Sequence, residues 1–387
     1  MGPSPSNSPT MTSTEFLRAC LRLRHSPDAH EALQALVHRL DGRWESLQPL
    51  IAAERLGPLL HRVVRAHGIA PPAVAAALRE SYLTTGLQNM LLWRELGHGL
   101  HQLAATGVAA IVLKGAALAE TVYGNPALRP MIDVDLLVHR RDLDAARRVF
   151  EGLGYVLERA ETHPGALAEH ESELALRKPG PVAAAVDLHW SLFDSPYYQH
   201  RIAMDWFWET AGTASIAGAP TLVLGPEALL IHLCGHLALH HGGKGLLWWH
   251  DVVEVLVWYR GRIDWPELLS RVEWYDLLLP VRTVLTGAAE EWGAPVPDAV
   301  LRALCAQVPS PRERRVFADL GAAQRSAGQR FWSDLVAIPD WRQRLRFART
   351  NLVPSAAYMR QRYRIAHPLL LPFYYPYRWL RGLRGDR

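Results

Sequence analysis

A chain of 387 residues is longer than one small domain, and an apolar fraction of 49% supplies enough hydrophobic side chains for buried cores, which excludes disorder along the whole length. Its three cysteines, Cys20, Cys234 and Cys305, are far apart and in no CxxC spacing, which excludes a disulfide framework and a cysteine-rich zinc site and fits a reducing, cytoplasmic setting. The net charge of +4 is uneven, because residues 341–387 hold 11 arginines, one aspartate and no lysine, and this asymmetry predicts an anionic partner for the C-terminal segment.

The N-terminal part of the chain shows no sign of a membrane or secretory segment. No run approaches the roughly 18 uncharged apolar residues of a spanning helix, and residues 1–12 lack a charged stretch followed by an apolar one. We expect a disordered leader over residues 1–12. Thr12 and Glu15 then form a predicted capping box, and apolar residues recur at steps of three and four through residue 105. Residues 13–105 are therefore predicted to form an N-terminal helical lobe.

The apolar pattern changes from helical to strand-like near Gly107. Short apolar runs predict strands at residues 108–113, 133–139, 155–160, 173–178 and 183–192, and an amphipathic helix at 140–154. Lys114 and Gly115 stand where the first strand turns into a helix. Residues 106–222 are thus predicted to form a mixed sheet with helices packed on it, in an α+β protein.

Helical periodicity returns at Pro226 and continues to about residue 350. We expect a C-terminal helical domain over residues 223–350. Residues 351–387 are aromatic, interrupted by prolines and rich in arginine, and we treat them as a basic aromatic tail. Its arginines and aromatic rings could bind nucleic acid bases or a membrane interface, or pack on the body of the protein.

Three aspartates on the predicted strands form the main candidate site. Asp133 and Asp135 are two residues apart, so their side chains leave the strand on the same face. Asp187 alternates with apolar neighbours on a later strand. If the two strands are neighbours, three carboxylates converge and repel one another, and a divalent cation would remove that conflict. Mg²⁺ favours such a set of carboxylates together with phosphate oxygens, and two ions can serve an in-line displacement.

The turn at Lys114 and Gly115 is the second candidate element. A glycine at the start of a helix lets backbone N–H groups approach an anion, and Lys114 adds a positive charge. Arg129, four residues before Asp133, is a second candidate for phosphate contact, although it could instead brace the strand. His189 shares the face of Asp187 and could orient a substrate or a ligand carboxylate, or be a packed histidine.

The segment LKGAALAETVYGNPALRPMIDVDLLV, with the later VDLHW, resembles the uncharacterised nucleotidyltransferase family of the DNA polymerase beta superfamily. The resemblance implies a polymerase-beta-like mixed sheet flanked by N- and C-terminal helical lobes. It also implies that Asp133, Asp135 and Asp187 bind metal, and that Lys114 and Gly115 lie in the triphosphate-binding turn. Much of the superfamily has a serine after the turn glycine, whereas this chain has Ala116.

The favoured hypothesis is a cytoplasmic nucleotidyltransferase that uses Mg²⁺, or Mn²⁺ in its place, and a nucleoside triphosphate such as ATP. It would transfer a nucleoside monophosphate to a hydroxyl-type acceptor, which could be a small molecule, a peptide or a protein, and release pyrophosphate. One alternative is an inactive nucleotide- or partner-binding protein on the same scaffold. Another is a zinc hydrolase at His232 and His236, although Leu233 stands where zincins have glutamate. A third is a nucleic-acid-directed transferase that uses the basic tail.

Overall fold

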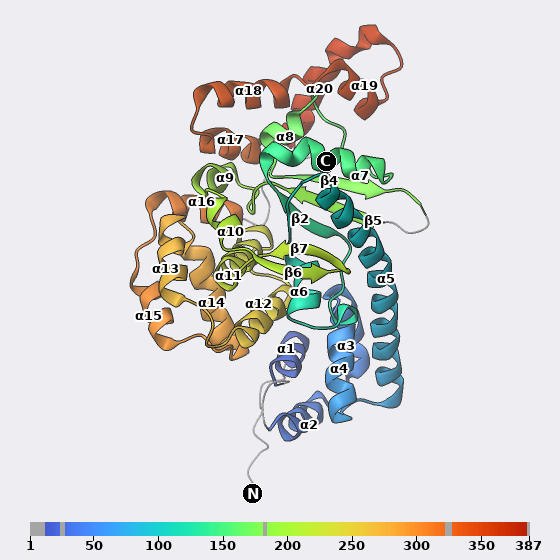
Figure 1. Cartoon of the computed structure of the whole chain (residues 1–387), viewed down its shortest axis with the longest axis vertical. Helices are drawn as coiled ribbons and strands as arrows, with labels where there is room; N and C mark the ends of the chain where they lie inside the picture. Colours follow the sequence, from blue (N-terminus) through green and yellow to red (C-terminus); the bar gives the residue numbers. More distant parts are fainter. Residues whose placement is uncertain (1–11, 24–27, 181–183, 322–326, 385–387) are drawn as a thin grey trace, which may run out of the picture.

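The computed structural model describes residues 12–23, 28–180, 184–321 and 327–384, and it confirms the α+β class. Most of the predicted leader therefore lies outside the described residues. A seven-stranded mixed sheet lies at the centre, with helices on both sides and at both ends (Figure 1). The N-terminal helices gather at one end of the molecule and the last four helices at the other.

The strands of the sheet are β1 (Ala110–Val112), β2 (Val134–Val138), β3 (Val156–Leu157), β4 (Glu173–Lys178), β5 (Ala184–His189), β6 (Gly212–Ile216) and β7 (Ala219–Val223). Their order is β3-β4-β5-β2-β1-β7-β6, so β2 is the central strand. β2 pairs with β5 in parallel and β1 pairs with β7 in parallel, while the other pairs are antiparallel.

The predicted strands agree with the sheet in its middle and differ at its edges. Strands expected at 108–113, 133–139, 173–178 and 183–192 are confirmed over their described cores, but the strand expected at 155–160 is only two residues long. The hairpin β6–β7 was not predicted. Its first strand is largely exposed and lacks a buried alternating pattern, and β7 joins the sheet by pairing with the distant β1.

The N-terminal lobe consists of five helices. They are α1 (Ser13–Leu23), α2 (Ala29–Leu40), α3 (Trp44–Ala53), α4 (Gly57–His67) and α5 (Pro72–Ala105). The capping box is present, since Thr12 N donates to Glu15 Oε2 at 2.8 Å and Glu15 N donates to Thr12 Oγ1 at 3.2 Å. The 34-residue helix α5 begins with a proline in its first turn, where the missing N–H costs nothing, and runs along the sheet (Figure 1).

Short helices connect the strands. They are α6 (Lys114–Thr121), α7 (Leu143–Gly152), α8 (Ala166–His170), α9 (Pro196–Arg201) and α10 (Asp205–Glu209), with 3₁₀ turns η1 (Pro126–Leu128) and η2 (Arg140–Asp142). The helices that follow the sheet begin with α11 (Pro226–Gly235), the π-helical segment η3 (His236–His240), α12 (Leu246–Trp258), α13 (Trp265–Trp274), α14 (Leu278–Trp292), α15 (Asp298–Ala306) and α16 (Pro311–Gly321).

The chain then continues in α17 (Ala327–Ala337), α18 (Trp341–Leu352), α19 (Ala356–Tyr363), a 3₁₀ turn η4 (Pro368–Leu370) and α20 (Leu371–Arg384). The predicted tail is thus mostly helical. Asp340 and Ser355 cap α18 and α19 by accepting hydrogen bonds from backbone N–H groups three residues on, and α20 continues through Pro376. None of the described helices is both long and apolar enough to cross a bilayer.

Two hydrophobic clusters cover the two faces of the sheet. Ile111 and Leu137 belong to the cluster that includes the C-terminal helices, whereas Val112 and Leu136 belong to the cluster that includes α7 and the second half of α5. The central strands are therefore buried on both faces, which is why they appear as continuous apolar runs. Asp135 shares its face with Leu137 and so faces the C-terminal helices.

The packing of α5 against the β6–β7 hairpin yields a test. A Cβ at Gly97 would lie 2.7 Å from the carbonyl oxygen of Ala217 in the hairpin turn. We expect Gly97→Ala to lower the free energy of unfolding by about 1–3 kcal/mol, since backbone must shift. Gly152→Ala, at a helical glycine with nothing within 4 Å, should be neutral or stabilising. Urea unfolding measures both, and equal midpoints would contradict this packing.

Candidate functional site

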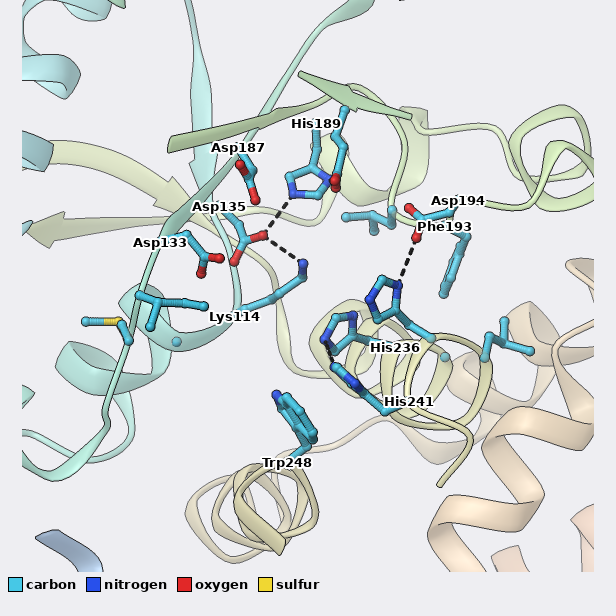
Figure 2. A pocket seen from close by; sticks show the side chains of 18 of the residues that line it. Lys114, Asp133, Asp135, Asp187, His189, Phe193, Asp194, His236, His241 and Trp248 are labelled. Atoms are coloured by element: carbon cyan, nitrogen blue, oxygen red, sulfur yellow. Dashed lines mark hydrogen bonds and ion pairs between the residues drawn. The ribbon is translucent and has the colours of Figure 1, made fainter. Parts of the chain in front are cut away.

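The three predicted aspartates lie together at the central strands. Asp135 of β2 is directly opposite Asp187 of β5 in the parallel register, and Asp133 immediately precedes β2. Neighbouring strands are about 4.8 Å apart, so the Asp135 and Asp187 side chains start side by side. All three line a pocket of about 740 Å³ that the sheet shares with the C-terminal helices (Figure 2).

Asp135 is the most buried of the three carboxylates, with 7% of its surface exposed. Its Oδ1 accepts hydrogen bonds from Lys114 Nζ at 2.7 Å and from His189 Nε2 at 2.9 Å. Burial alone would raise the pKa of Asp135, but the charges and hydrogen bonds of Lys114 and His189 hold it well below its usual value. The buried carboxylate is therefore ionised.

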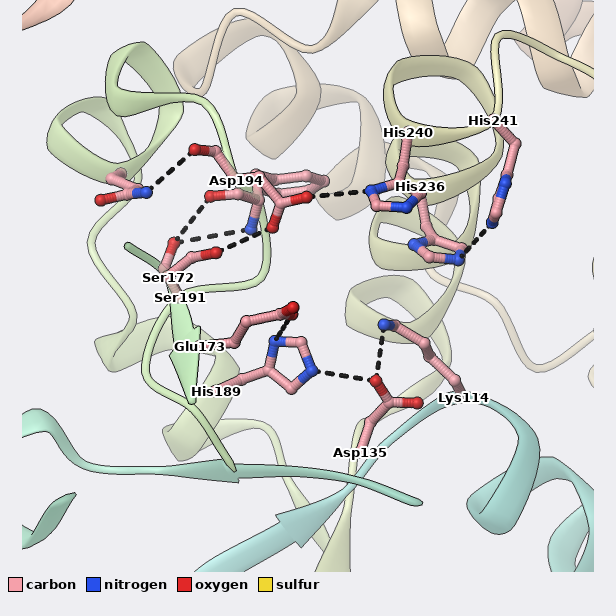
Figure 3. A network of polar contacts seen from close by, with 12 residues as sticks. Lys114, Asp135, Ser172, Glu173, His189, Ser191, Asp194, His236, His240 and His241 are labelled. Atoms are coloured by element: carbon pink, nitrogen blue, oxygen red, sulfur yellow. Dashed lines mark hydrogen bonds and ion pairs between the residues drawn. The ribbon is translucent and has the colours of Figure 1, made fainter. Parts of the chain in front are cut away.

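His189 connects Asp135 to a fourth carboxylate. Its Nδ1 lies 3.3 Å from Glu173 Oε2, on the neighbouring strand β4, where Glu173 is the register partner of His189 (Figure 3). Burial and Lys114 lower the pKa of His189, but the hydrogen bond to Asp135 and the charge of Glu173 leave it above its usual value. His189 thus holds the Asp135 carboxylate in place. Glu173 was not among the predicted site residues, because only the antiparallel pairing of β4 with β5 brings it there.

Asp187 and Asp133 are less well compensated than Asp135, and the pKa values of both are raised. Burial, followed by repulsion from Asp135 and Glu173, raises the pKa of Asp187 to about 7. Burial and Asp135 also raise the pKa of Asp133. Oxygen donors that resist ionisation beside one another suit a hard divalent cation.

The side chains of the three aspartates do not surround a common ion position in this structure. Among the described residues, no group of three or more His, Cys, Asp or Glu side chains has an arrangement that would hold a metal. Asp135 Oδ1 instead accepts hydrogen bonds from Lys114 and His189 (Figure 2). The donor chemistry fits a cation, and binding one would require Asp135 to share its carboxylate.

The predicted turn at Lys114 and Gly115 lines the same pocket. Lys114 has a φ of 44°, which is unusual for a residue with a side chain and stores strain. Gly115 has ordinary backbone geometry, but a Cβ there would lie 2.9 Å from Met131 Cγ. Both residues line the pocket at the N-terminus of α6. Glycine is needed here for close packing, not for a positive φ.

Arg129 lines the pocket, but its guanidinium is already paired with the carboxylate of Asp251. Its Nη2 lies 2.7 Å from Asp251 Oδ2 and its Nε lies 2.9 Å from Asp251 Oδ1, while Nη1 donates to the carbonyl of Pro130. Tyr123 also donates to Asp251, at 2.8 Å. Asp251 belongs to α12, so Arg129 ties the segment before β2 to a C-terminal helix. That Arg129 contacts phosphate stays a prediction. The ion pair with Asp251 of α12 is sufficient to explain the observed geometry of Arg129.

Arg55 is a pocket residue that no motif indicated. It lies in the turn between α3 and α4, has a φ of 54°, and reaches the pocket from the N-terminal lobe. Burial, followed by repulsion from Arg129, lowers its pKa. Within the described residues it forms no ion pair at 4 Å or less. Its guanidinium lies 6.0 Å from the centre of the Trp248 ring. A partly buried cation without a carboxylate partner is suited to an anionic ligand.

Three histidines and a tryptophan line the pocket across from the aspartates. They are His236 and His240 on η3, His241 just after it, and Trp248 on α12 (Figures 2 and 3). His241 stacks on Trp248 with ring centres 3.4 Å apart, and its Nε2 lies 3.0 Å from His236 Nε2. Burial lowers the pKa of His241 to about 4 and that of His236 well below its usual value, so both are neutral. His240 Nδ1 lies 2.9 Å from Asp194 Oδ2, which raises the pKa of His240 (Figure 3).

His236 lines the pocket, whereas His232 does not. His232 is only 1% exposed and lies outside the pocket lining, and burial lowers its pKa to about 3. The chain changes from α-helix to π-helix at His236, which shifts the histidines that follow. The geometry therefore gives no support to the zinc hydrolase alternative.

The pKa of Asp187 yields a second test. Removing the neighbouring charge with Asp135→Asn should lower the pKa of Asp187 from about 7 towards its usual value, with burial preserving part of the rise. Asp194→Asn, in the same pocket, should leave it unchanged. In the native protein, folded Asp187 binds its proton more tightly than unfolded Asp187 does. Protonation of Asp187 therefore stabilises the fold fully below about pH 4, and this stabilisation is lost as the pH rises through about 7. Carboxyl ¹³C NMR titration measures the pKa, and no shift in Asp135→Asn would contradict the charge coupling.

The bracing role of Arg129 yields a third test. Asp251→Asn leaves the buried guanidinium without its counter-charge, and we expect it to lower the free energy of unfolding by about 3–5 kcal/mol. Glu151→Gln, which breaks the more exposed Arg147–Glu151 pair within α7, should change it by about 0.5 kcal/mol or less. Urea unfolding compares the two. Similar losses in both variants would show that the buried pair does not brace the site.

The chain resembles one protein family over most of its length. A family model described as "Uncharacterised nucleotidyltransferase" matches residues 41–293, which run from α3 through the sheet to α14. Among curated proteins, none matches the chain. Among solved structures, an antigenic nucleotidyltransferase-like protein from Paracoccidioides brasiliensis is 15% identical, with a TM-score of 0.34 over 58% of this chain and 96% of that one. Because the family model covers well over half of its length, the chain belongs to the uncharacterised nucleotidyltransferase family.

Proposed function

We propose that this protein is a metal-dependent nucleotidyltransferase that moves a nucleoside monophosphate from a nucleoside triphosphate to a hydroxyl group of an acceptor. The observation that carries the proposal is the register of β2 and β5, which sets Asp135 beside Asp187 at the floor of a pocket. The N-terminus of α6 and the side chain of Lys114 open at the same floor. Family membership supports a general role in nucleotidyl transfer.

Asp133, Asp135 and Asp187 would hold Mg²⁺, or Mn²⁺ in its place. A bound divalent cation neutralises phosphate charge and stabilises the oxygens that enter and leave during an in-line displacement. The position of the three carboxylates on one pocket wall supports this assignment. The pKa values of Asp187 and Asp133 are raised by burial first and then by repulsion from Asp135, which a cation would relieve. His189 would keep the Asp135 carboxylate oriented while Lys114 turns to the substrate.

The triphosphate would lie between two lobes of the protein. Lys114 and the N–H groups at the start of α6 would contact phosphate oxygens from the sheet side. Arg55 would approach from the N-terminal lobe, where its guanidinium has no carboxylate partner among the described residues. The stacked pair of His241 and Trp248 offers a flat aromatic surface for the nucleobase.

The reaction itself needs positioning and one proton transfer. The acceptor oxygen attacks the α-phosphorus, the bond from that phosphorus to the bridging oxygen breaks, and pyrophosphate leaves with the bond electrons. Ionised Asp187 would accept the proton that leaves the acceptor hydroxyl as its oxygen bonds to phosphorus. Alignment and charge neutralisation supply most of the remaining acceleration.

The proposal is tested by following both products. Purified protein is incubated with each α-³²P-labelled triphosphate, Mg²⁺ and a cell extract, and transfer of label and pyrophosphate release are measured. We expect Asp135→Asn and Asp187→Asn each to lower transfer by about 100-fold or more. Asp187→Asn should retain the fold, whereas Asp135→Asn should also lower stability, because Lys114 loses its counter-charge. Chelation of divalent cations should abolish it. Asp144→Asn, at an exposed carboxylate of α7, should retain full activity.

Calorimetry with ATP and Mg²⁺ separates this proposal from its nearest alternative. Nucleotide binding without pyrophosphate release, for every triphosphate and extract, would favour an inactive nucleotide-binding protein on the same scaffold. Full transferase activity in Asp135→Asn would end the assignment of the aspartates.

A further inference from the structure

The last helices of the chain combine positive charge with exposed apolar side chains. Residues 341–385 contain ten arginines and no aspartate or glutamate. Helices α18, α19 and α20 lie together at the end of the molecule opposite α1 and α2 (Figure 1). This group plays no part in the chemistry of the pocket described above.

One face of α20 and the turn before it is an exposed apolar stripe. The most exposed members are Leu369 at 76% and Phe373 at 74%, followed by Leu380 at 56% and Tyr377 at 48%. These positions are three or four residues apart, so they share one side of the helix. We call them the α20 stripe.

The opposite side of α20 is anchored to its neighbours. Tyr375 Oη donates to the carbonyl of Pro354 and Trp379 Nε1 donates to the carbonyl of Leu352, both at 2.7 Å. The Tyr374 ring packs against Tyr363 of α19, with centres 5.6 Å apart. The inner side of the helix is thus fixed on α18 and α19. Leu369, Phe373 and Leu380 of the stripe are left facing outward, while the half-exposed Tyr377 ring also contacts Tyr363 edge-on, with centres 5.9 Å apart.

We propose that the α20 stripe, with the arginines of α18 and α19, binds the surface of a membrane that contains anionic lipids. An amphipathic helix with an apolar face and a basic surrounding lies in the interface plane, with the apolar side chains at the level of the acyl boundary. Tyr377 is of a residue type enriched at that depth. Exposed arginines such as Arg360 and Arg362 attract phosphate headgroups, and neither has an ion pair with a carboxylate in the part of the chain that the structure describes.

The composition of the stripe favours lipid over nucleic acid. Single-stranded nucleic acid is held by aromatic rings on which bases stack. Leu369 and Leu380, two of the three most exposed members, have no ring to stack. Aliphatic side chains gain instead from burial in hydrocarbon. The ten arginines of residues 341–385 also favour a membrane with anionic lipids over a neutral membrane.

The test uses the full chain and lipid vesicles. Co-sedimentation is measured with vesicles of phosphatidylcholine alone and with vesicles in which about a third of the lipid is phosphatidylglycerol. We expect binding to the anionic vesicles and little to the neutral ones. The double variant Phe373→Ser and Leu380→Ser should lower the partition coefficient by about 10-fold or more. Leu87→Ser and Met90→Ser, at side chains of α5 that are 62% and 70% exposed, is the matched control and should bind as the parent does.

A second pair of variants tests the charge without touching the apolar stripe. Arg360→Gln with Arg362→Gln should weaken binding to anionic vesicles, whereas Arg65→Gln with Arg79→Gln, at exposed arginines of α4 and α5, should not. The proposal is overturned if neither vesicle is bound, or if both serine double variants bind equally. It is also overturned if the stripe variant instead abolishes binding of single-stranded RNA or a concentration-dependent dimer while vesicle binding is unchanged.

Discussion

The structure depends on a negative charge buried in the middle of its central strand. Asp135 lies on β2 between apolar residues of the core, where an uncompensated carboxylate would be costly. Lys114 and His189 compensate it from two other elements, the start of α6 and the end of β5. The turn after β1, the position of β5 and the orientation of His189 are therefore linked to one side chain.

The same arrangement leaves Asp187 and Asp133 without comparable compensation. Asp187 is the direct strand neighbour of Asp135, yet Lys114 and His189 both donate to Asp135. The pKa of Asp187 is raised to about 7 as a consequence, with burial as the first cause. Such a site can take up a proton, and the proposed cation would remove the repulsion between its carboxylates.

The pocket is assembled from parts that are distant in the chain. The sheet supplies the aspartates, the N-terminal lobe supplies Arg55, and the π-helical segment with α12 supplies the aromatic wall. The buried pair of Arg129 and Asp251 ties the sheet side to α12. The α20 stripe lies outside this assembly, so lipid binding and transferase activity can be tested separately.

The sequence by itself determined the central strands, the turn at Lys114 and Gly115, the shared face of Asp133 and Asp135 and the resemblance to the family that the chain belongs to. These features depend on local periodicity and on short motifs, which act within a few residues. The tertiary structure alone decided that Asp187 is the register partner of Asp135, that Glu173 lies behind His189, that Arg129 pairs with Asp251 and that Arg55 reaches the pocket. Each of these contacts joins residues far apart in the chain. Strand order, helix docking and burial bring the residues together, and the local sequence around either residue does not reveal its partner.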